Sequence, residues 1–178
     1  GAGKSTLLYL ISGLDTPKSG QILLDGTPLL RKDLDSYRHG TVATISQSYL
    51  LFPTRTAMEN VLYPLQLAKT APDTAAAEAR KCLLSVGIRE ELHNRLPSKL
   101  SGGEQQRVAI ARCLAAHSQI IAADEPTGNL DEENAREVMR ILTALAHEQG
   151  KIVIVVTHDT VLAEQADRQY HLEYGMLT

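Results

Sequence analysis

A strand–helix–strand unit in the last third of the chain sets the fold class. Gln119 to Ala123 is an apolar run too short for a helix, so it predicts a buried strand. An amphipathic helix follows, capped by Asp131 and ending at Gly150. Lys151 to Thr157 is rich in β-branched residues and predicts a second strand. Strands that alternate with helices form parallel sheets covered on both faces, so we predict an α/β fold.

The other segments extend this alternation and interrupt it with a helical block. Thr56 and Ser101 each precede a glutamate by three residues, the pattern of a capping box at a helix start. The further predicted elements are helices at 4–12, 56–69 (interrupted by Pro64), 73–86, 101–116 and 160–166, and strands at 21–24, 41–46 and 168–173. We expect one domain, residues 1–178, with residues 48–116 forming an inserted helical subdomain.

Composition excludes several classes of protein. The net charge is −3, from 18 basic and 21 acidic residues, which argues against a general nucleic-acid coat. The longest strongly apolar run, Ile152 to Val156, is far too short to span a membrane. Cys82 and Cys113 have no metal-ligand spacing and form no disulfide framework. These features fit a reduced, cytosolic protein.

Gly1-Ala2-Gly3-Lys4-Ser5-Thr6 has the residue types that end a phosphate-binding loop. Glycine lets backbone amides approach phosphate oxygens, Lys4 supplies a mobile cation, and the Ser5 hydroxyl is placed to bind Mg²⁺. The alternative is an ordinary glycine-rich helix start. The first glycine of the full motif would lie three residues before Gly1, so we expect the chain to be truncated at its N-terminus.

Asp124 and Glu125 follow the predicted strand at 119–123. Carboxylates at the carboxyl end of such a strand lie where open α/β sheets bind ligands. Asp124 can hold Mg²⁺ through water, and Glu125 can polarise an attacking water. The alternative is a helix cap or a solvated turn, because Pro126 comes next.

Ser101-Gly102-Gly103 begins the helix predicted at 101–116. Its capping box is a sufficient structural explanation for Ser101. Two glycines in a first helical turn nevertheless cost about 1 kcal/mol each, which suggests close approach to another group. Free amides at a helix N-terminus form an anion site. The domain would then have two phosphate-binding surfaces, and a head-to-tail dimer would bring them together.

Shorter motifs complete the set: Gln47 at a strand end, Gly128-Asn129-Leu130-Asp131, and Thr157-His158-Asp159. With the segments above, they resemble the ATP-binding subunit of an ABC transporter, a P-loop NTPase with a mainly parallel sheet flanked by helices. Leu100 to Gln106 resembles the signature sequence of that family. The amino-acid sequences of residues 51–53, 56–64 and 124–131 are most similar to one branch of this family, which includes lipoprotein-releasing, macrolide-export and cell-division ATPases.

The resemblance implies ATP and Mg²⁺ as cofactors and a role for each matching residue. The residues that would hold the nucleotide phosphates in one subunit are Gly1, Ala2, Gly3, Lys4, Ser5 and Thr6. Those that would close on the partner's nucleotide or cross the dimer interface are Ser101, Gly102, Gly103 and Asp131. Those that would place Mg²⁺ are Ser5, Gln47 and Asp124. The catalytic residues would be Glu125 as general base, His158 at the γ-phosphate, and Gln47.

Simpler interpretations of single residues stay open at this point. Gln47 can be a polar strand end, and a histidine after a strand, such as His158, is commonly a turn residue. Phe52, the sole phenylalanine, can be a core residue or a partner contact. The remaining histidines match no motif and are assigned to the surface or to packing: His39, His93, His117, His147 and His171.

The resemblance also implies the working of the whole assembly. ATP would clamp a homodimer or pseudo-dimer, and hydrolysis would open it and drive integral-membrane subunits that move a lipoprotein, peptide or drug. Residues 48–63 would face those subunits, with the protein cytoplasmic and peripheral on the inner face of the membrane. The alternative is an ABC-type ATPase acting on nucleic acid or regulating cell division. Such relatives usually carry coiled-coil or zinc insertions that are absent here, so no nucleic-acid partner is expected. A third reading, a nucleotide-binding module without catalysis, conflicts with the presence of Glu125 and His158.

Overall fold

The computed structural model describes residues 3–178, so the predictions for Gly1 and Ala2 lie outside the described residues. In chain order the elements are α1 (Lys4–Ile11), β1 (Leu23–Leu24), β2 (Thr27–Pro28), η1 (Arg31–Asp33), α2 (Leu34–Gly40), β3 (Val42–Ser46), α3 (Ala57–Leu67), α4 (Pro72–Ser85), η2 (Glu90–Leu92), η3 (Pro97–Lys99), α5 (Gly102–Ala115), β4 (Ile120–Asp124), α6 (Glu132–His147), β5 (Ile152–Val156), α7 (Thr160–Ala163), β6 (Leu172–Glu173) and β7 (Met176–Leu177).

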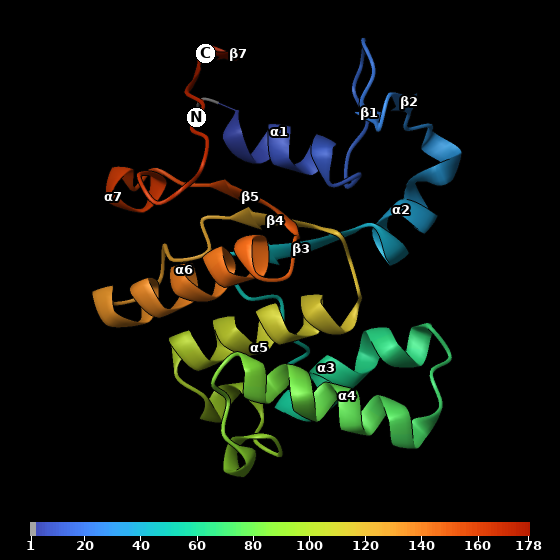
Figure 1. Cartoon of the computed structure of the whole chain (residues 1–178), viewed down its shortest axis with the longest axis vertical. Helices are drawn as coiled ribbons and strands as arrows, with labels where there is room; N and C mark the ends of the chain where they lie inside the picture. The colour runs from blue at the N-terminus through green and yellow to red at the C-terminus, as the bar shows by residue number, and fades with distance from the viewer. Residues whose placement is uncertain (1–2) are drawn as a thin grey trace.

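A parallel sheet ordered β3-β4-β5 lies at the centre, which confirms the predicted α/β class. Side chains of β4 alternate between two cores: Ile121 faces one and Ala122 the other. Helices α5 and α6 cover the first face and α1 covers the second (Figure 1). In register, Ser46 pairs with Asp124 and Asp124 with Val156, so the three strands end side by side.

The helical block consists of α3, α4 and α5, which pack on one another below the sheet (Figure 1). Both predicted capping boxes are present, at Thr56 and at Ser101. The prediction that Pro64 interrupts the first of these helices is wrong, because α3 continues through it. The proline removes one backbone hydrogen bond. Burial of Val61 and Leu65 on the same helix offsets that loss.

The least regular segments differ most from the sequence prediction. Helix α2 was not predicted, because Asp33 makes no side-chain cap and only Leu34 and Tyr37 become buried. The Tyr37 hydroxyl anchors this helix by donating to the carbonyl of Ile11 at 2.9 Å. The last predicted strand, 168–173, is reduced to β6 and forms a hairpin with β7. Across residues 3–178, no helix combines the length and the apolar character that crossing a lipid bilayer requires.

Candidate active site

The start of α1 lies against the carboxyl end of β4. Gly3 precedes this helix with a φ of 92°, a left-handed conformation that favours glycine. One turn of helix then presents Lys4, Ser5 and Thr6, and the Ser5 hydroxyl donates to Asp124 Oδ1 at 3.1 Å. Residues 119 positions apart in the sequence therefore meet, as predicted for a phosphate loop beside a strand-end carboxylate.

Glu125 is held at the carboxyl end of β5 by several hydrogen bonds. Its backbone has a φ of 46°, and its N–H donates to the carbonyl of Val156 at 2.8 Å. Its Oε1 lies 2.8 Å from His158 Nδ1, and its Oε2 accepts from the Thr157 hydroxyl at 3.2 Å. The Glu125 side chain is 18% exposed and His158 is 74% exposed. The fold thus brings together two of the three residues predicted to be catalytic, Glu125 and His158.

Sequence reasoning assigned no role to Thr157, which the structure places in this cluster. Its Oγ1 accepts the N–H of Asp159 at 3.0 Å and donates its single proton to Glu125. The hydroxyl therefore holds the carboxylate through the oxygen that His158 does not contact. The available signal was its position, a hydroxyl residue directly after a strand and before a histidine.

Gln47 extends β3 and contacts the loop that follows β4. Its Nε2 donates to Asn129 Oδ1 at 3.1 Å, and Asn129 Nδ2 donates to the Gln47 carbonyl at 3.0 Å. A Cβ on Gly128 would lie 2.8 Å from Gln47 Nε2, so a side chain at this position would shift the Gln47 carboxamide. Among the described residues no hydrogen bond joins Gln47 to Ser5 or Asp124. Its metal-binding and catalytic roles stay predictions.

The turn that begins α5 is packed against two other loops of the same chain. Ser101 Oγ accepts the Glu104 N–H at 3.2 Å, and Glu104 Oε2 accepts the Ser101 N–H at 2.7 Å. A Cβ on Gly102 would lie 2.9 Å from the Tyr49 hydroxyl, and one on Gly103 would lie 2.0 Å from Asn134 Oδ1. Close approach within the chain therefore requires glycine at 103, where the Asn134 Cβ would also lie only 2.9 Å away, whereas a side chain at 102 would displace the Tyr49 hydroxyl.

These segments gather on one side of the molecule. The starts of α1, α5 and α6 lie on the side where β4 and β5 end, with α1 above the sheet and α5 below it (Figure 1). In the described residues no hydrogen bond links Ser101 to Ser5 or Glu125. We refer to the residues around Ser5 and Glu125 as the first surface and to Ser101–Gly103 with Asp131 as the second surface.

Asp131 caps α6, as predicted. Its Oδ1 accepts the Asn134 N–H at 2.9 Å. Hydrogen bonds from the backbone and then the side chain of Asn134 hold the pKa of the Asp131 carboxyl below its ordinary value. Because the pKa is lower in the folded state, the charged cap contributes its full stabilisation at pH values above the ordinary carboxyl pKa. That stabilisation is lost as the pH falls through the pKa of the folded state.

Replacing Asp131 with alanine is expected to lower Tm by about 2–4 °C at pH 7, because an N-terminal amide of α6 loses its acceptor. The deficit should shrink as the pH falls below about 4, where the parent carboxylate becomes protonated. Calorimetry of both proteins between neutral and acidic pH measures this difference in Tm. A deficit that is constant with pH would exclude the charged cap.

The two thiols take no part in this chemistry. Burial raises the pKa of Cys82 and that of Cys113 to about 11, so both stay protonated near neutrality and are poor nucleophiles and metal ligands. Within residues 3–178, no cluster of three His, Cys, Asp or Glu side chains could hold a metal by itself.

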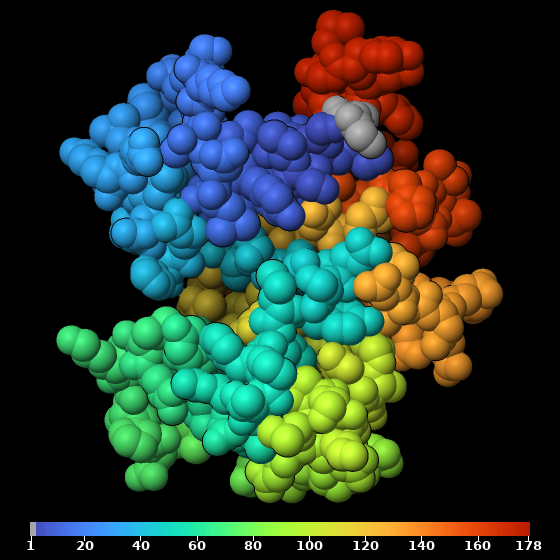
Figure 2. Space-filling model, turned by 180° about the vertical axis from the view of Figure 1, so that it is seen from behind, coloured from blue at the N-terminus to red at the C-terminus, as the bar shows by residue number. Residues whose placement is uncertain are grey.

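Residues 49–63 form an aromatic and cationic cluster after β3. The rings of Phe52 and Tyr63 meet edge to face with centroids 4.8 Å apart, and the Arg55 guanidinium lies 5.2 Å from the Phe52 centroid. Phe52 is half-buried, and the Arg112 guanidinium of α5 also lies 5.9 Å from its ring centroid. Leu50 is 65% exposed. Figure 2 shows this part of the chain (cyan) at the surface, between the α1 layer and the helical block.

Comparison with known proteins gives consistent matches. A family model described as "ABC transporter" matches residues 1–128. The lipoprotein-releasing system ATP-binding protein LolD of Bordetella pertussis is 43% identical over 182 residues, covering 99% of this chain and 78% of its own. The same protein of Bordetella parapertussis matches equally well.

Solved structures agree in fold. The dimeric ATP-binding cassette MJ0796, in a post-hydrolysis state bound to ADP and Pi, superposes with a TM-score of 0.88 and is 38% identical. The match covers 98% of this chain and 78% of that one. CbiO1 from Clostridium perfringens, part of the ABC transporter complex cbiONQ, has a TM-score of 0.89 at 28% identity, over 99% and 71% of the two chains.

Proposed function

This chain belongs to the ABC transporter family, as an ATP-binding and ATP-hydrolysing subunit, and from that membership we propose that its Ser5–Asp124 and Glu125–His158 pairs form one hydrolytic site. The observation that carries the proposal is their convergence at the carboxyl ends of β4 and β5. Open α/β sheets bind ligands at this edge.

The residues at the start of α1 suit a triphosphate and its metal. Lys4 and the amides of the first turn supply positive charge where phosphates would lie. The Ser5 hydroxyl and the Asp124 carboxylate, 3.1 Å apart, are hard oxygen donors of the kind that Mg²⁺ prefers. Bound there with Gln47, Mg²⁺ would neutralise charge on the phosphates.

Glu125 and His158 have different roles in hydrolysis: Glu125 acts on the attacking water and His158 on the γ-phosphate. The Glu125 carboxylate accepts a proton from the water, and Thr157 and His158 fix its orientation through Oε2 and Oε1. Because His158 Nδ1 contacts Glu125, Nε2 is the ring nitrogen that can reach the γ-phosphate. Catalysis is then positioning and charge stabilisation, since phosphoryl transfer needs little covalent help from the protein.

The second surface, Ser101 to Gly103 with Asp131, belongs to the nucleotide of a partner subunit. Solved relatives of this family include dimeric cassettes, which supports a homodimer or pseudo-dimer that closes head to tail on ATP. Segment 48–63, in which Leu50 is exposed, contacts integral-membrane subunits, and the protein is peripheral on the inner face of the membrane. Residues 48–116 are the helical subdomain that carries this contact. By its likeness to LolD, the transported substrate is a lipoprotein.

Sedimentation of the purified Glu125→Gln protein, which serves as the parent for further variants, tests whether ATP is bound between two subunits. ATP should convert the parent to dimers. Ser101→Arg should abolish the dimer but keep ATP bound to the monomer. Lys4→Ala should weaken ATP binding itself by about tenfold or more, because it removes a charged phosphate contact. Dimers that form equally in all variants, or without ATP, would contradict the shared site.

A further inference from the structure

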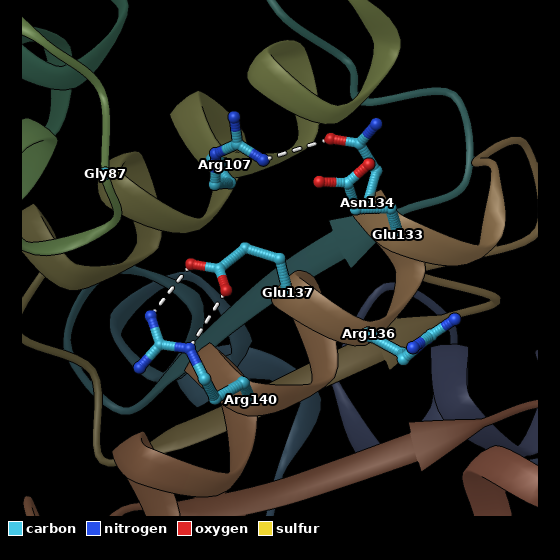
Figure 3. Close-up of a pocket in the computed structure, with 7 residues that line it drawn as sticks. All are labelled: Gly87, Arg107, Glu133, Asn134, Arg136, Glu137 and Arg140. Carbon is cyan, nitrogen blue, oxygen red and sulfur yellow. Dashed lines mark hydrogen bonds and ion pairs between the residues drawn. The ribbon is translucent and has the colours of Figure 1, made fainter.

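Asn134, which sequence reasoning passed over, contacts both segments proposed to face the partner subunit. Its Nδ2 donates to both Asp131 oxygens, at 3.0 and 2.9 Å. Its Oδ1 accepts from the Arg107 guanidinium of α5 at 3.2 Å. One carboxamide therefore uses donor and acceptor groups at once, with Asp131 on one side and α5 on the other. Figure 3 shows the Arg107–Asn134 bond crossing the groove between α5 and α6.

Packing at Gly103 makes this junction close. A Cβ there would lie 2.0 Å from Asn134 Oδ1 and 2.4 Å from its Cγ, so a side chain at position 103 would have to displace Asn134. Gly103 is buried, and α6 is in contact with α5 along this junction. The glycine thus lets α6 approach the first turn of α5, and Asn134 fills the space that it leaves.

We propose that Asn134 is a positioning residue that locks the Asp131 loop to the Ser101–Gly103 turn, so that both segments close on the partner's nucleotide as one unit. This inference rests on the proposed function, because it assigns those two segments to the shared ATP. Asn134 itself touches neither nucleotide nor reacting water. It acts by fixing the distance between two groups that do.

The groove beside this junction has a volume of about 440 Å³, and its other two arginines form their ion pairs within α6. Arg140 makes two hydrogen bonds to Glu137 on its own helix, at 2.9 and 2.8 Å. Arg136 pairs with Glu132 one turn away. These ion pairs stay within α6, whereas the Arg107–Asn134 bond connects α5 with α6.

The test replaces each half of the link in the Glu125→Gln background. Asn134→Asp keeps the size and the acceptor for Arg107, but places a carboxylate oxygen where Nδ2 now donates to Asp131. Arg107→Met removes the other half. Each should weaken ATP-dependent dimerisation by about tenfold while ATP binding to the monomer stays unchanged. Combining the two should weaken it no further, because both act on one network.

Glu133→Gln is the matched control, since Glu133 is exposed on the same turn and lines the same groove. It should dimerise like the parent. If Asn134→Asp fails to fold, Asn134→Ala removes the same side-chain contacts without adding charge. Parent-like dimerisation of Asn134→Asp or Asn134→Ala, measured well below Tm, would overturn the proposal.

Amide hydrogen exchange separates failure of this inference from failure of the proposed function. If ATP does not dimerise even the parent, the shared site is wrong, yet the link is still measurable in the monomer. Asn134→Asp should then speed exchange at Glu104 and at residue 134 together, because their amides are held by the two caps. Faster exchange at only one of them would exclude a lock between the segments.

Discussion

Replacing Glu125 with glutamine is expected to lower ATP turnover by about a hundredfold to ten-thousandfold while ATP binding is retained. Glutamine has nearly the same shape, and its amide oxygen can still accept one of the hydrogen bonds that position the carboxylate. It cannot accept the proton of the attacking water. The effect should therefore appear in kcat, with little change in the dissociation constant of ATP.

Phosphate release by the purified protein and a separate ATP titration measure these two quantities. Glu164→Gln is a suitable control, because Glu164 is an exposed glutamate outside the site, and its kcat should match the parent. Full-rate hydrolysis by Glu125→Gln would remove Glu125 from the role of general base. Loss of ATP binding together with loss of turnover would mean that the carboxylate contributes to binding of ATP itself and not to the chemical step alone.

Replacing Leu83 with alanine is expected to cost about 2–5 kcal/mol of unfolding free energy. Leu83 is fully buried on α4 and belongs to the core shared by the helical block and the sheet. Truncation leaves a cavity that close-packed neighbours fill only in part. Urea unfolding, with its midpoint and slope, measures the change.

The next residue supplies the control. Leu84 is the same residue type on the same helix but is 48% exposed, so Leu84→Ala should change the free energy by no more than about 0.5 kcal/mol. The comparison holds helix propensity constant and isolates burial. Equal costs at both positions would mean that α4 is not packed on α3 and α5 as described.

Local sequence signals predicted the regular elements well because those signals are local. The capping boxes at Thr56 and Ser101 use residues three apart, and both formed. The apolar run before Asp124 predicted β4, and alternation of strands and helices predicted parallel pairing. The prediction of a helix break at Pro64 was wrong. Burial of neighbouring residues keeps α3 continuous, and that burial depends on tertiary packing that the local sequence does not show.

The candidate site likewise has features that the sequence predicts and features that appear only in the folded structure. The Glu125–His158 pair follows from placing two motifs at the ends of neighbouring parallel strands, and the Ser5–Asp124 pair from placing a phosphate loop beside one of those strand ends. The reason for Gly103 does not, since a glycine in a helix start does not reveal that Asn134 will occupy the space beside it. Likewise, the bond between Gln47 and Asn129 joins residues 82 positions apart whose loops have no fixed geometry before folding.

Helix α5 has a mechanical consequence beyond the contacts at its start. Through Arg112 it donates hydrogen bonds to the carbonyls of Leu50, at 2.8 Å, and Tyr49, at 3.3 Å, two residues in left-handed backbone conformation. The helix is 14 residues long, about 20 Å. A displacement of the segment around Leu50 would therefore be transmitted along α5 to the turn at Ser101 without an intervening joint. Under the proposed function, this helix connects the segment that would face the membrane subunits to the turn that would close on the partner's nucleotide.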